Sequence, residues 1–372
     1  MPWSPMTVTD QRQEFVTLAR QPGANISELS RRFQISRKTA YKWLGRQDMG
    51  DQSRRPLRSP ARTEQRLEQA ALAIRDEHPA WGARKIAHVL KRDQHIDLAP
   101  STVNTILRRH GRISAQASEA AQRWQRFEHP QPNALWQMDF KGHFAMHTGR
   151  CHPLTVLDDH SRFAIVLRAL PNERRTSVQA VLQHAFERFG LPDRINTDNG
   201  APWGCSAQEG LTRLAVWLIR LGVGLSYSSP AHPQTNGKDE RFHRTFKAEV
   251  LNVHSFADLE QAQQRFDAWR HTYNHHRPHQ ALEMATPASR YCASLRSMPA
   301  QLPDIEYPSG DHVRKVQQGG WISFEGRDIR LSKALAGSAV ALRATGEHDG
   351  TFDVYFCHQR VDFVDLRNMD ML

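Results

Sequence analysis

Cysteine is scarce in this sequence: only Cys151, Cys205, Cys292 and Cys357 occur among 372 residues, and no two of them form a Cys-x-x-Cys pair. This spacing supports neither a disulfide framework nor a zinc site built on cysteine. The first residues lack the apolar segment of a signal peptide, and no apolar run reaches the length needed to cross a bilayer. We therefore expect a soluble, intracellular protein with no membrane partner.

Acidic residues are also in short supply. The chain has 39 Asp and Glu against 50 Lys and Arg, which gives a net charge of +11 and a pI of about 9.8. A basic excess of this size indicates a polyanionic partner, most simply nucleic acid, although a basic surface without a dedicated ligand would give the same composition. The length predicts about two or three domains.

Residues 1–50 predict three short helices. Asn25 has the spacing to Glu28 of a helix-capping pair, and Ser36 can cap a third helix that runs to about Arg46. Two short helices joined by a tight turn indicate a helix-turn-helix DNA-binding domain, with an ordinary helical hairpin as the alternative. The predicted recognition helix carries four candidate DNA-binding residues, which are Arg37, Lys38, Thr39 and Lys42.

Residues 51–62 read as a basic linker, because they combine two prolines with four arginines. This linker would either follow DNA phosphates or remain solvated. Residues 63–112 repeat the three-helix pattern, with Thr63 as a cap and Gly111 at the end, and predict a second helix-turn-helix-like domain. Residues 113–133 predict a linker helix that leads to Pro130 and Pro132.

From Leu135 the pattern changes to strands that alternate with helices. WQMDFKGHF, HPLTVLDD and FAIVLRAL predict three strands of an antiparallel meander, and RINTDNG and VGLSYS predict two more strands between helices. This order predicts an α/β domain with a mixed sheet covered by helices, over 134–298.

Three acids stand where chemistry would be placed. Asp139 interrupts the first strand, Asp198 ends the fourth strand, and Glu240 lies in the first turn of a helix, with 41 residues between Asp198 and Glu240. Three oxygen ligands of this kind suit Mg²⁺ or Mn²⁺. The same helix carries basic residues expected to hold the phosphate backbone, namely Lys238, Arg241, Arg244 and Lys247.

The series WQMDF, TDNG and HPQTNGKDERFHRTFK resembles the catalytic core of DDE-type transposases and retroviral-type integrases, and above all bacterial insertion-sequence transposases. LDDHSRF and YNHHRPHQAL resemble accessory segments of the same proteins. The resemblance implies an RNase H-like (integrase) core and assigns Asp139, Asp198 and Glu240 as ligands of two Mg²⁺ (or Mn²⁺) ions. It also implies double-stranded DNA as partner (element ends and target), a homo-oligomer on DNA, and the bacterial cytosol as location.

The resemblance leaves alternative functions open: a nuclease that only hydrolyses DNA, or a sequence-specific repressor with an inactive core. The interval before Glu240 is longer than is typical of the wider group, which we attribute to an insertion at 202–213. Asp158 and Asp159 are expected in a turn, and Asp239 is expected to point elsewhere on the helix than Glu240. His271 and His275 have helical spacing and favour DNA contact or packing over zinc.

Residues 309–372 contain short strand patterns punctuated by glycine. They predict a small C-terminal β-barrel or a sandwich. The resemblance suggests a module that contacts DNA or protein, and a folded domain without direct DNA contact is the alternative.

Overall fold

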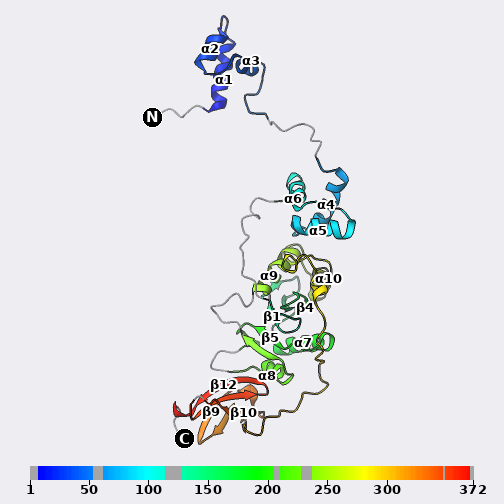
Figure 1. The fold of residues 1–372 in the computed structure, drawn as a ribbon, viewed down its shortest axis with the longest axis vertical. Coiled ribbons are helices and arrows are strands. Elements are labelled where there is room, and N and C mark those ends of the chain that lie inside the picture. The colour runs from blue at the N-terminus through cyan, green and yellow to red at the C-terminus, as the bar shows by residue number, and fades with distance from the viewer. Residues whose placement is uncertain are drawn as a thin grey trace. The chain divides into compact units, whose positions relative to one another are not determined.

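The computed structural model describes residues 7–52, 62–113, 128–204, 210–227, 237–346 and 348–368. The chain divides into two compact units, Met1–Thr63 and Glu64–Leu372 (Figure 1). The predicted helix in the 113–133 linker and most of the basic linker lie outside the described residues. No helix in the described ranges is both long and apolar enough to span a membrane.

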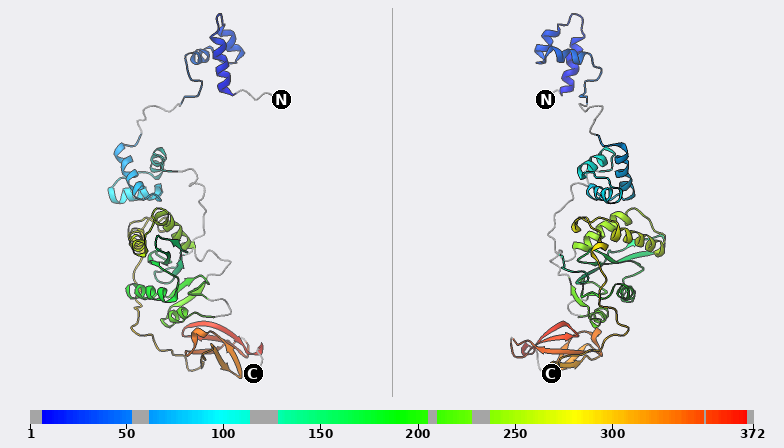
Figure 2. Two further views of the ribbon diagram at one scale, coloured as in Figure 1. Left: turned by 180° about the vertical axis from the view of Figure 1, so that it is seen from behind. Right: turned by 45° about the vertical axis from the view of Figure 1, so that its right-hand side comes forward.

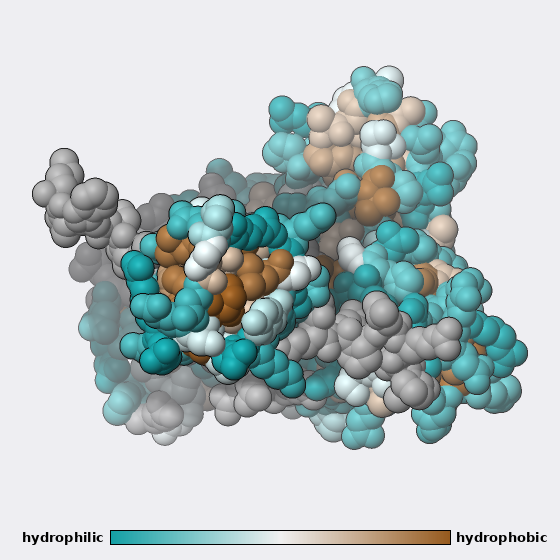
Figure 3. All heavy atoms as spheres, turned by 90° about the horizontal axis from the view of Figure 1, so that it is seen from above, coloured by the Kyte–Doolittle hydropathy of each residue, from teal (hydrophilic) through white to brown (hydrophobic). Residues whose placement is uncertain are grey.

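The first unit has the predicted helices α1 (Val8–Ala19), α2 (Ile26–Arg32) and α3 (Arg37–Leu44). Asn25 caps α2 by accepting from the backbone N–H groups of Ser27 and Glu28. Ser36 caps α3 in the same way, as the sequence predicts. Trp43 is buried with Phe15 and Val16 in a small core. In Figure 3 hydrophilic residues cover most of the visible surface, with hydrophobic residues in smaller areas.

The second unit begins with three more helices, which are α4 (Gln65–Glu77), α5 (Ala83–Gln94) and α6 (Pro100–Arg109). Their apolar faces share a core that includes Trp81, Ile86 and Leu90. The α4 helix begins after Glu64 without a side-chain cap, so the prediction of Thr63 as its cap is wrong. Otherwise the predicted three-helix arrangement is present.

The central sheet has the strand order β2-β3-β1-β5-β6, with β4 paired to β3. Its strands are β1 (Trp136–Phe140), β2 (Phe144–Ala145), β3 (Arg150–Asp158), β4 (Ala164–Leu170), β5 (Arg194–Thr197) and β6 (Gly224–Tyr227). The pairs β1–β3 and β3–β4 are antiparallel, whereas β1–β5 and β5–β6 are parallel. The predicted mixed sheet is therefore present, although the segment predicted as one strand, WQMDFKGHF, contains two.

Helices cover both faces of this sheet, as Figure 2 shows. α7 (Arg175–Phe189) and α8 (Arg213–Arg220) pack on the face of Trp136 and Met138. α9 (Gly237–Phe246), the π-helical turn η3 (Lys247–Leu251) and α10 (Leu259–His275) pack on the other face, against Leu157 and Leu167. Because side chains alternate along a strand, Asp139 points away from Met138 and toward the α9 face.

Gly190 ends α7 for a steric reason. Its φ is +75°, and a Cβ at this position would lie 2.6 Å from the carbonyl oxygen of Ser294. Any other residue would therefore combine a left-handed backbone with a clash. Two short 3₁₀ turns, η4 (Gln280–Leu282) and η5 (Pro287–Arg290), follow α10.

The C-terminal region forms an open sheet rather than a barrel. Its four antiparallel strands have the order β12-β11-β10-β7, beside a separate β8–β9 hairpin. Their bounds are β7 (His312–Lys315), β8 (Trp321–Phe324), β9 (Arg327–Arg330), β10 (Ala339–Ala344), β11 (Thr351–Phe356) and β12 (Gln359–Asp365), with the 3₁₀ turns η6 (Lys333–Leu335) and η7 (Leu366–Asn368). The predicted β-barrel is therefore wrong. Hairpin signals in the sequence indicate which consecutive strands pair, but they do not indicate whether the first and last strands pair to close a barrel.

This sheet covers the edge of the central one. The Gln359 side chain donates to the carbonyl of Leu225 on β6 and accepts from its N–H, at 3.1 and 2.7 Å. The hydroxyl of Ser332 donates to the carbonyl of Leu211 at 2.8 Å. Apolar residues of both sheets belong to one continuous core. The otherwise open edge of β6 is thus protected from pairing with another chain.

Candidate catalytic site

Asp139 and Asp198 come together because β1 and β5 are parallel neighbours. Gln137 is level with Asn196 in this pair, so Asp139 and Asp198 are level two residues further along. Burial, followed by the negative charge of Asp198, raises the pKa of Asp139 to about 7. An acid whose ionisation is opposed by a second acid at the carboxyl ends of two parallel strands favours a bound cation.

Asp198 is held by its own loop. Its Oδ1 accepts from the backbone N–H of Gly200 at 3.0 Å and from the indole N–H of Trp203. The Trp203 ring stacks on Phe140, the residue after Asp139, with centroids 5.2 Å apart. Sequence reasoning treated 202–213 as an insertion and missed Trp203. The signal in the sequence is a tryptophan four residues after the segment TDN, which ends the fourth predicted strand.

Helix α9 presents two adjacent acids in different ways. Asp239 is 1% exposed, and its two carboxylate oxygens have no hydrogen-bond partner in the part of the chain that the structure describes. Burial and the charges of Asp139 and Asp159 raise the pKa of Asp239 well above its usual value. Glu240 is exposed. Asp239 and Glu240 therefore point in different directions, as expected, but the acid buried within reach of the charge of Asp139 is Asp239 and not Glu240.

The acids that face one another suit a hard divalent cation, because carboxylate oxygens without partners are the ligands that Mg²⁺ and Mn²⁺ prefer. Among the described residues, however, no group of three His, Cys, Asp or Glu side chains is already placed to hold a metal ion. The structure brings together Asp139 and Asp198, and leaves Glu240 at the exposed start of α9.

His243, one turn after Glu240, also reaches this site. Its Nε2 lies 2.8 Å from the hydroxyl of Thr155, which donates to the carbonyl of Asp139 at 2.9 Å. Its Nδ1 lies 3.8 Å from the Asp139 carboxylate. Burial, with Lys141 nearby, lowers the pKa of His243 to about 3, so the imidazole is neutral. Because the Thr155 hydroxyl donates its hydrogen to the backbone carbonyl of Asp139, it can only accept from His243, so Nε2 of His243 carries the hydrogen.

The LDDHSRF segment forms a buried polar anchor under the site. Asp158 accepts from the N–H groups of Asn133 (2.7 Å) and Ser161 (2.8 Å). Asp159 accepts from the Gln137 side chain at 2.8 Å and forms an ion pair with Lys238. These contacts confirm that the two aspartates serve the turn after β3.

The predicted DNA-contact residues divide into two groups. Lys238 is committed to Asp159 inside the fold, whereas Arg241, Arg244 and Lys247 are exposed on one side of α9 and its π-helical continuation. On α3, Arg37, Lys38 and Lys42 are exposed, and the Thr39 hydroxyl is 2.9 Å from that of its cap, Ser36. The contact of these side chains with DNA stays a prediction.

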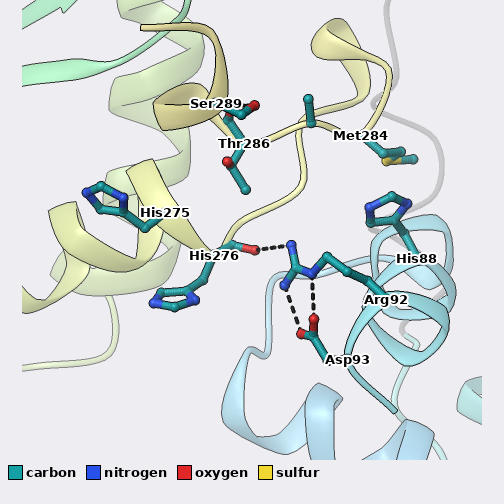
Figure 4. A pocket seen from close by; sticks show the side chains of 9 residues that line it. His88, Arg92, Asp93, His275, His276, Met284, Thr286 and Ser289 are labelled. Atoms are coloured by element: carbon teal, nitrogen blue, oxygen red, sulfur yellow. Dashed lines mark hydrogen bonds and ion pairs between the residues drawn. The ribbon is translucent and has the colours of Figure 1, made fainter. Parts of the chain in front are cut away.

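The histidines near the end of α10 pack together. The His271 ring centroid lies 4.8 Å from that of His275 and 5.2 Å from that of His276. Figure 4 shows Arg92 of α5 between Asp93 and the carbonyl oxygen of His276, which it contacts at 3.3 Å. This contact is part of a 570 Å³ cavity between α5 and the end of α10. The second three-helix group is thereby joined to the central domain.

Family models match the two helical groups, most of the central domain and the C-terminal strands. Two models of the integrase core domain match 129–233 and 221–287. Two homeodomain-like domain models match 6–53 and 39–107. The model of the IS481 family transposase C-terminal domain matches 311–371. Fold and site together define a protein with helix-turn-helix DNA-binding domains and an integrase core.

Proteins of insertion elements align with the central region. The IS136 uncharacterized protein Atu4601 of Agrobacterium fabrum is 36% identical over 140 residues, which are 36% of this chain and 69% of that protein. The IS407 uncharacterized 31.7 kDa protein of Burkholderia multivorans is 31% identical, over 45% of this chain and 57% of its own length. The IS476 uncharacterized 39.2 kDa protein of Xanthomonas euvesicatoria is 30% identical, over 45% of this chain and 47% of its own length. The chain thus spans about half the length of the last two relatives.

The chain belongs to the IS481-family transposases, which confirms the resemblance found in the sequence. Among solved structures, the HTLV-2 integrase catalytic core domain in complex with magnesium (dimeric form) is 17% identical. The structural alignment covers 43% of this chain and 96% of the HTLV-2 chain, with a TM-score of 0.31.

Proposed function

We propose that this protein binds the ends of a mobile DNA element and catalyses DNA cleavage and strand transfer. The observation that carries the proposal is the placement of Asp139 and Asp198 at adjacent parallel strands, where the charge of Asp198 opposes the ionisation of Asp139. Acids in such an arrangement are typical of a site that holds divalent cations and acts on phosphodiesters.

Asp139, Asp198 and Glu240 would hold two Mg²⁺ or Mn²⁺ ions. Bound there, the ions would lower the pKa of an attacking water or 3′-hydroxyl and stabilise the leaving oxygen. Glu240 is one residue beyond the buried Asp239, a step of about 100° around a helix. Its participation therefore requires the first turn of α9 to rotate or its long side chain to fold back. No serine, tyrosine or cysteine nucleophile is needed, and no covalent protein–DNA intermediate forms.

DNA binding is divided between two kinds of contact. Arg241, Arg244 and Lys247 supply salt-dependent, sequence-independent contacts to phosphate near the acids. The α3 helix, with Arg37, Lys38, Thr39 and Lys42, reads base edges in the major groove. Because transposition joins two element ends to a target, the DNA-bound form is a homo-oligomer.

One assay tests this function. Purified protein is incubated with Mg²⁺, labelled element ends and a plasmid target, and with Asp198→Asn in parallel. Joined products that disappear in the variant, while DNA binding persists, support the transposase. Nicks without joining would identify a nuclease, and a retarded band without cleavage would identify a repressor. Undiminished joining by Asp198→Asn would refute the site.

A further inference from the structure

A second cavity lies inside the C-terminal compact unit, between the starts of α5 and α6 and the exposed side of α9. Its volume is about 550 Å³, and its lining includes Gly82, Arg84, Lys85, Ser101, Asn104 and Arg241. None of the described residues that line it is acidic. We call this cavity the α5–α6–α9 pocket.

The backbone makes one wall of the pocket electropositive. The N-caps of α5 and α6 are Gly82 and Ala99, and neither helix has a side-chain hydrogen bond at its N-cap. The helices have 12 and 10 residues, long enough for a developed dipole. The partial positive charge at each helix end, with the N–H groups of the first turns (Pro100, the first residue of α6, has none), therefore favours an anion in the space between them.

Three cations complete the pocket. Within the described ranges, no hydrogen bond or ion pair occupies the side chains of Arg84, Lys85 and Arg241. Burial, followed by the positive charge of Arg277, lowers the pKa of Lys85 to about 7, and Arg241 adds to the effect. Glu249, which does not line the pocket, partly opposes this effect. Positive groups that line a pocket with no acid in its wall repel one another, and a bound anion would relieve this repulsion.

The source of the anion follows from the place of the pocket. α6 is the third helix of the second three-helix group, and in a helix-turn-helix this helix enters the major groove with its N-terminal residues foremost. Ser101 and Asn104 lie near that end of α6. Arg241 belongs to the helix that carries Glu240. A DNA strand that follows α6 would therefore pass the catalytic acids.

We propose that the α5–α6–α9 pocket binds one phosphodiester of the DNA backbone, held jointly by Lys85 of the helical group and Arg241 of the catalytic domain. The site would fix the distance along the duplex between the bases read by α6 and the bond that is cut. This inference rests on the proposed function and adds a positioning contact to it.

The test measures DNA affinity of the full chain as a function of salt, for Lys85→Gln, Arg241→Gln and the double variant. Release of counterions from one phosphate changes the slope of log affinity against log salt by about 0.9. Each single variant should make the slope less steep by up to that amount, and equally for element-end and unrelated duplexes. The double variant should also change it by about 0.9, not by twice as much, because both side chains serve one phosphate.

Lys91→Gln is the matched control, because Lys91 lies on the same helix, is exposed, and pairs with Asp97 at 2.9 Å outside the pocket. Lys85→Arg keeps the charge and should restore the wild-type slope, which separates loss of contact from loss of folding. Wild-type slopes in both single variants, or a double variant that changes the slope by twice 0.9, would overturn the shared site.

The anion in the pocket could also be a free phosphate ion instead of a phosphodiester of DNA. If inorganic phosphate raises the melting temperature of the wild type but not of Lys85→Gln, while the DNA slopes stay equal, the pocket serves the ion and the DNA assignment is wrong. If Lys85→Gln and Arg241→Gln lose joining but keep the wild-type slope of log DNA affinity against log salt, the proposed transposase function stands and the phosphate-binding pocket is rejected. Failure of the wild type to bind any DNA would reject both.

Discussion

The indole N–H of Trp203 donates a hydrogen bond to Oδ1 of Asp198, while the indole ring stacks on Phe140 beside Asp139. One side chain thus fixes the orientation of one acid and packs against the strand that carries the other. Trp203 is itself 3% exposed. The loop after β5 is in this way tied to β1 independently of the sheet hydrogen bonds.

Trp203→Phe should reduce strand transfer because it removes the N–H donor and keeps the stacking ring. We expect a loss of joining of about ten- to a hundredfold, in line with about 1.5–3 kcal/mol for a hydrogen bond to a charged group. Joining rates at saturating Mg²⁺ measure the effect. Trp217→Phe is the control, since Trp217 packs against Phe186 of α7, away from Asp198. Equal losses in both variants would mean that Trp203 acts only through packing.

Glu240→Gln and Asp239→Asn should separate the two acids at the start of α9. If Glu240 is the third ligand, its variant should lose joining by at least about a hundredfold, as expected for a group required in the transition state. Asp239→Asn should retain joining within about threefold, because it replaces a buried acid with a side chain of the same shape without removing a ligand. A steep loss with Asp239→Asn and normal joining by Glu240→Gln would transfer the catalytic role to Asp239.

The strands of the core could be predicted because their signals are local. WQMDF, RINT and VGLSY alternate or cluster apolar residues between clear turn residues, and the structure places β1, β5 and β6 there. The same signals predicted that Asp139 lies in the first strand and that Asp198 ends the fourth, but not that these two strands are neighbours. These features depend on residues within a few positions of one another.

The remaining features depend on contacts between distant segments. The rotation of α9 about its axis, which buries Asp239 and exposes Glu240, is set by packing of Phe242 and Phe246 against α10. The partner of Lys238 is Asp159, 79 residues earlier. The C-terminal strands gave no sign of whether their sheet closes, because closure depends on a pair of strands that are not neighbours in the chain.

Lys238→Met should destabilise the fold rather than weaken DNA binding alone. Asp159 is 1% exposed and would lose the cation of its ion pair, a change that costs about 3–5 kcal/mol when a buried charge is left behind. Chemical unfolding monitored by circular dichroism measures the loss. Lys247→Met is the counterpart on the exposed continuation of α9. It should leave stability unchanged and lower DNA affinity; the reverse pattern would place the phosphate contact at Lys238.

The pH dependence of metal binding should follow Asp139. In the metal-free protein its pKa is raised to about 7, chiefly by burial and then by Asp198, so below that pH a proton occupies the carboxylate and competes with the cation. A raised acid pKa also means that the folded state loses stability between the unfolded value of 3.8 and about 7 as pH rises. Bound Mg²⁺ would reverse this loss.

We therefore expect Mg²⁺ affinity to fall by about tenfold per pH unit below pH 7 and to level off above it. The fluorescence of Trp203, which contacts Asp198, offers a readout that does not require catalysis. In Asp198→Asn the pKa of Asp139 should fall, because the opposing charge is gone, and the break in the profile should move to lower pH. A profile that is flat from pH 5 to pH 8 in the wild type would show that Asp139 is ionised throughout and that its burial is relieved by another group.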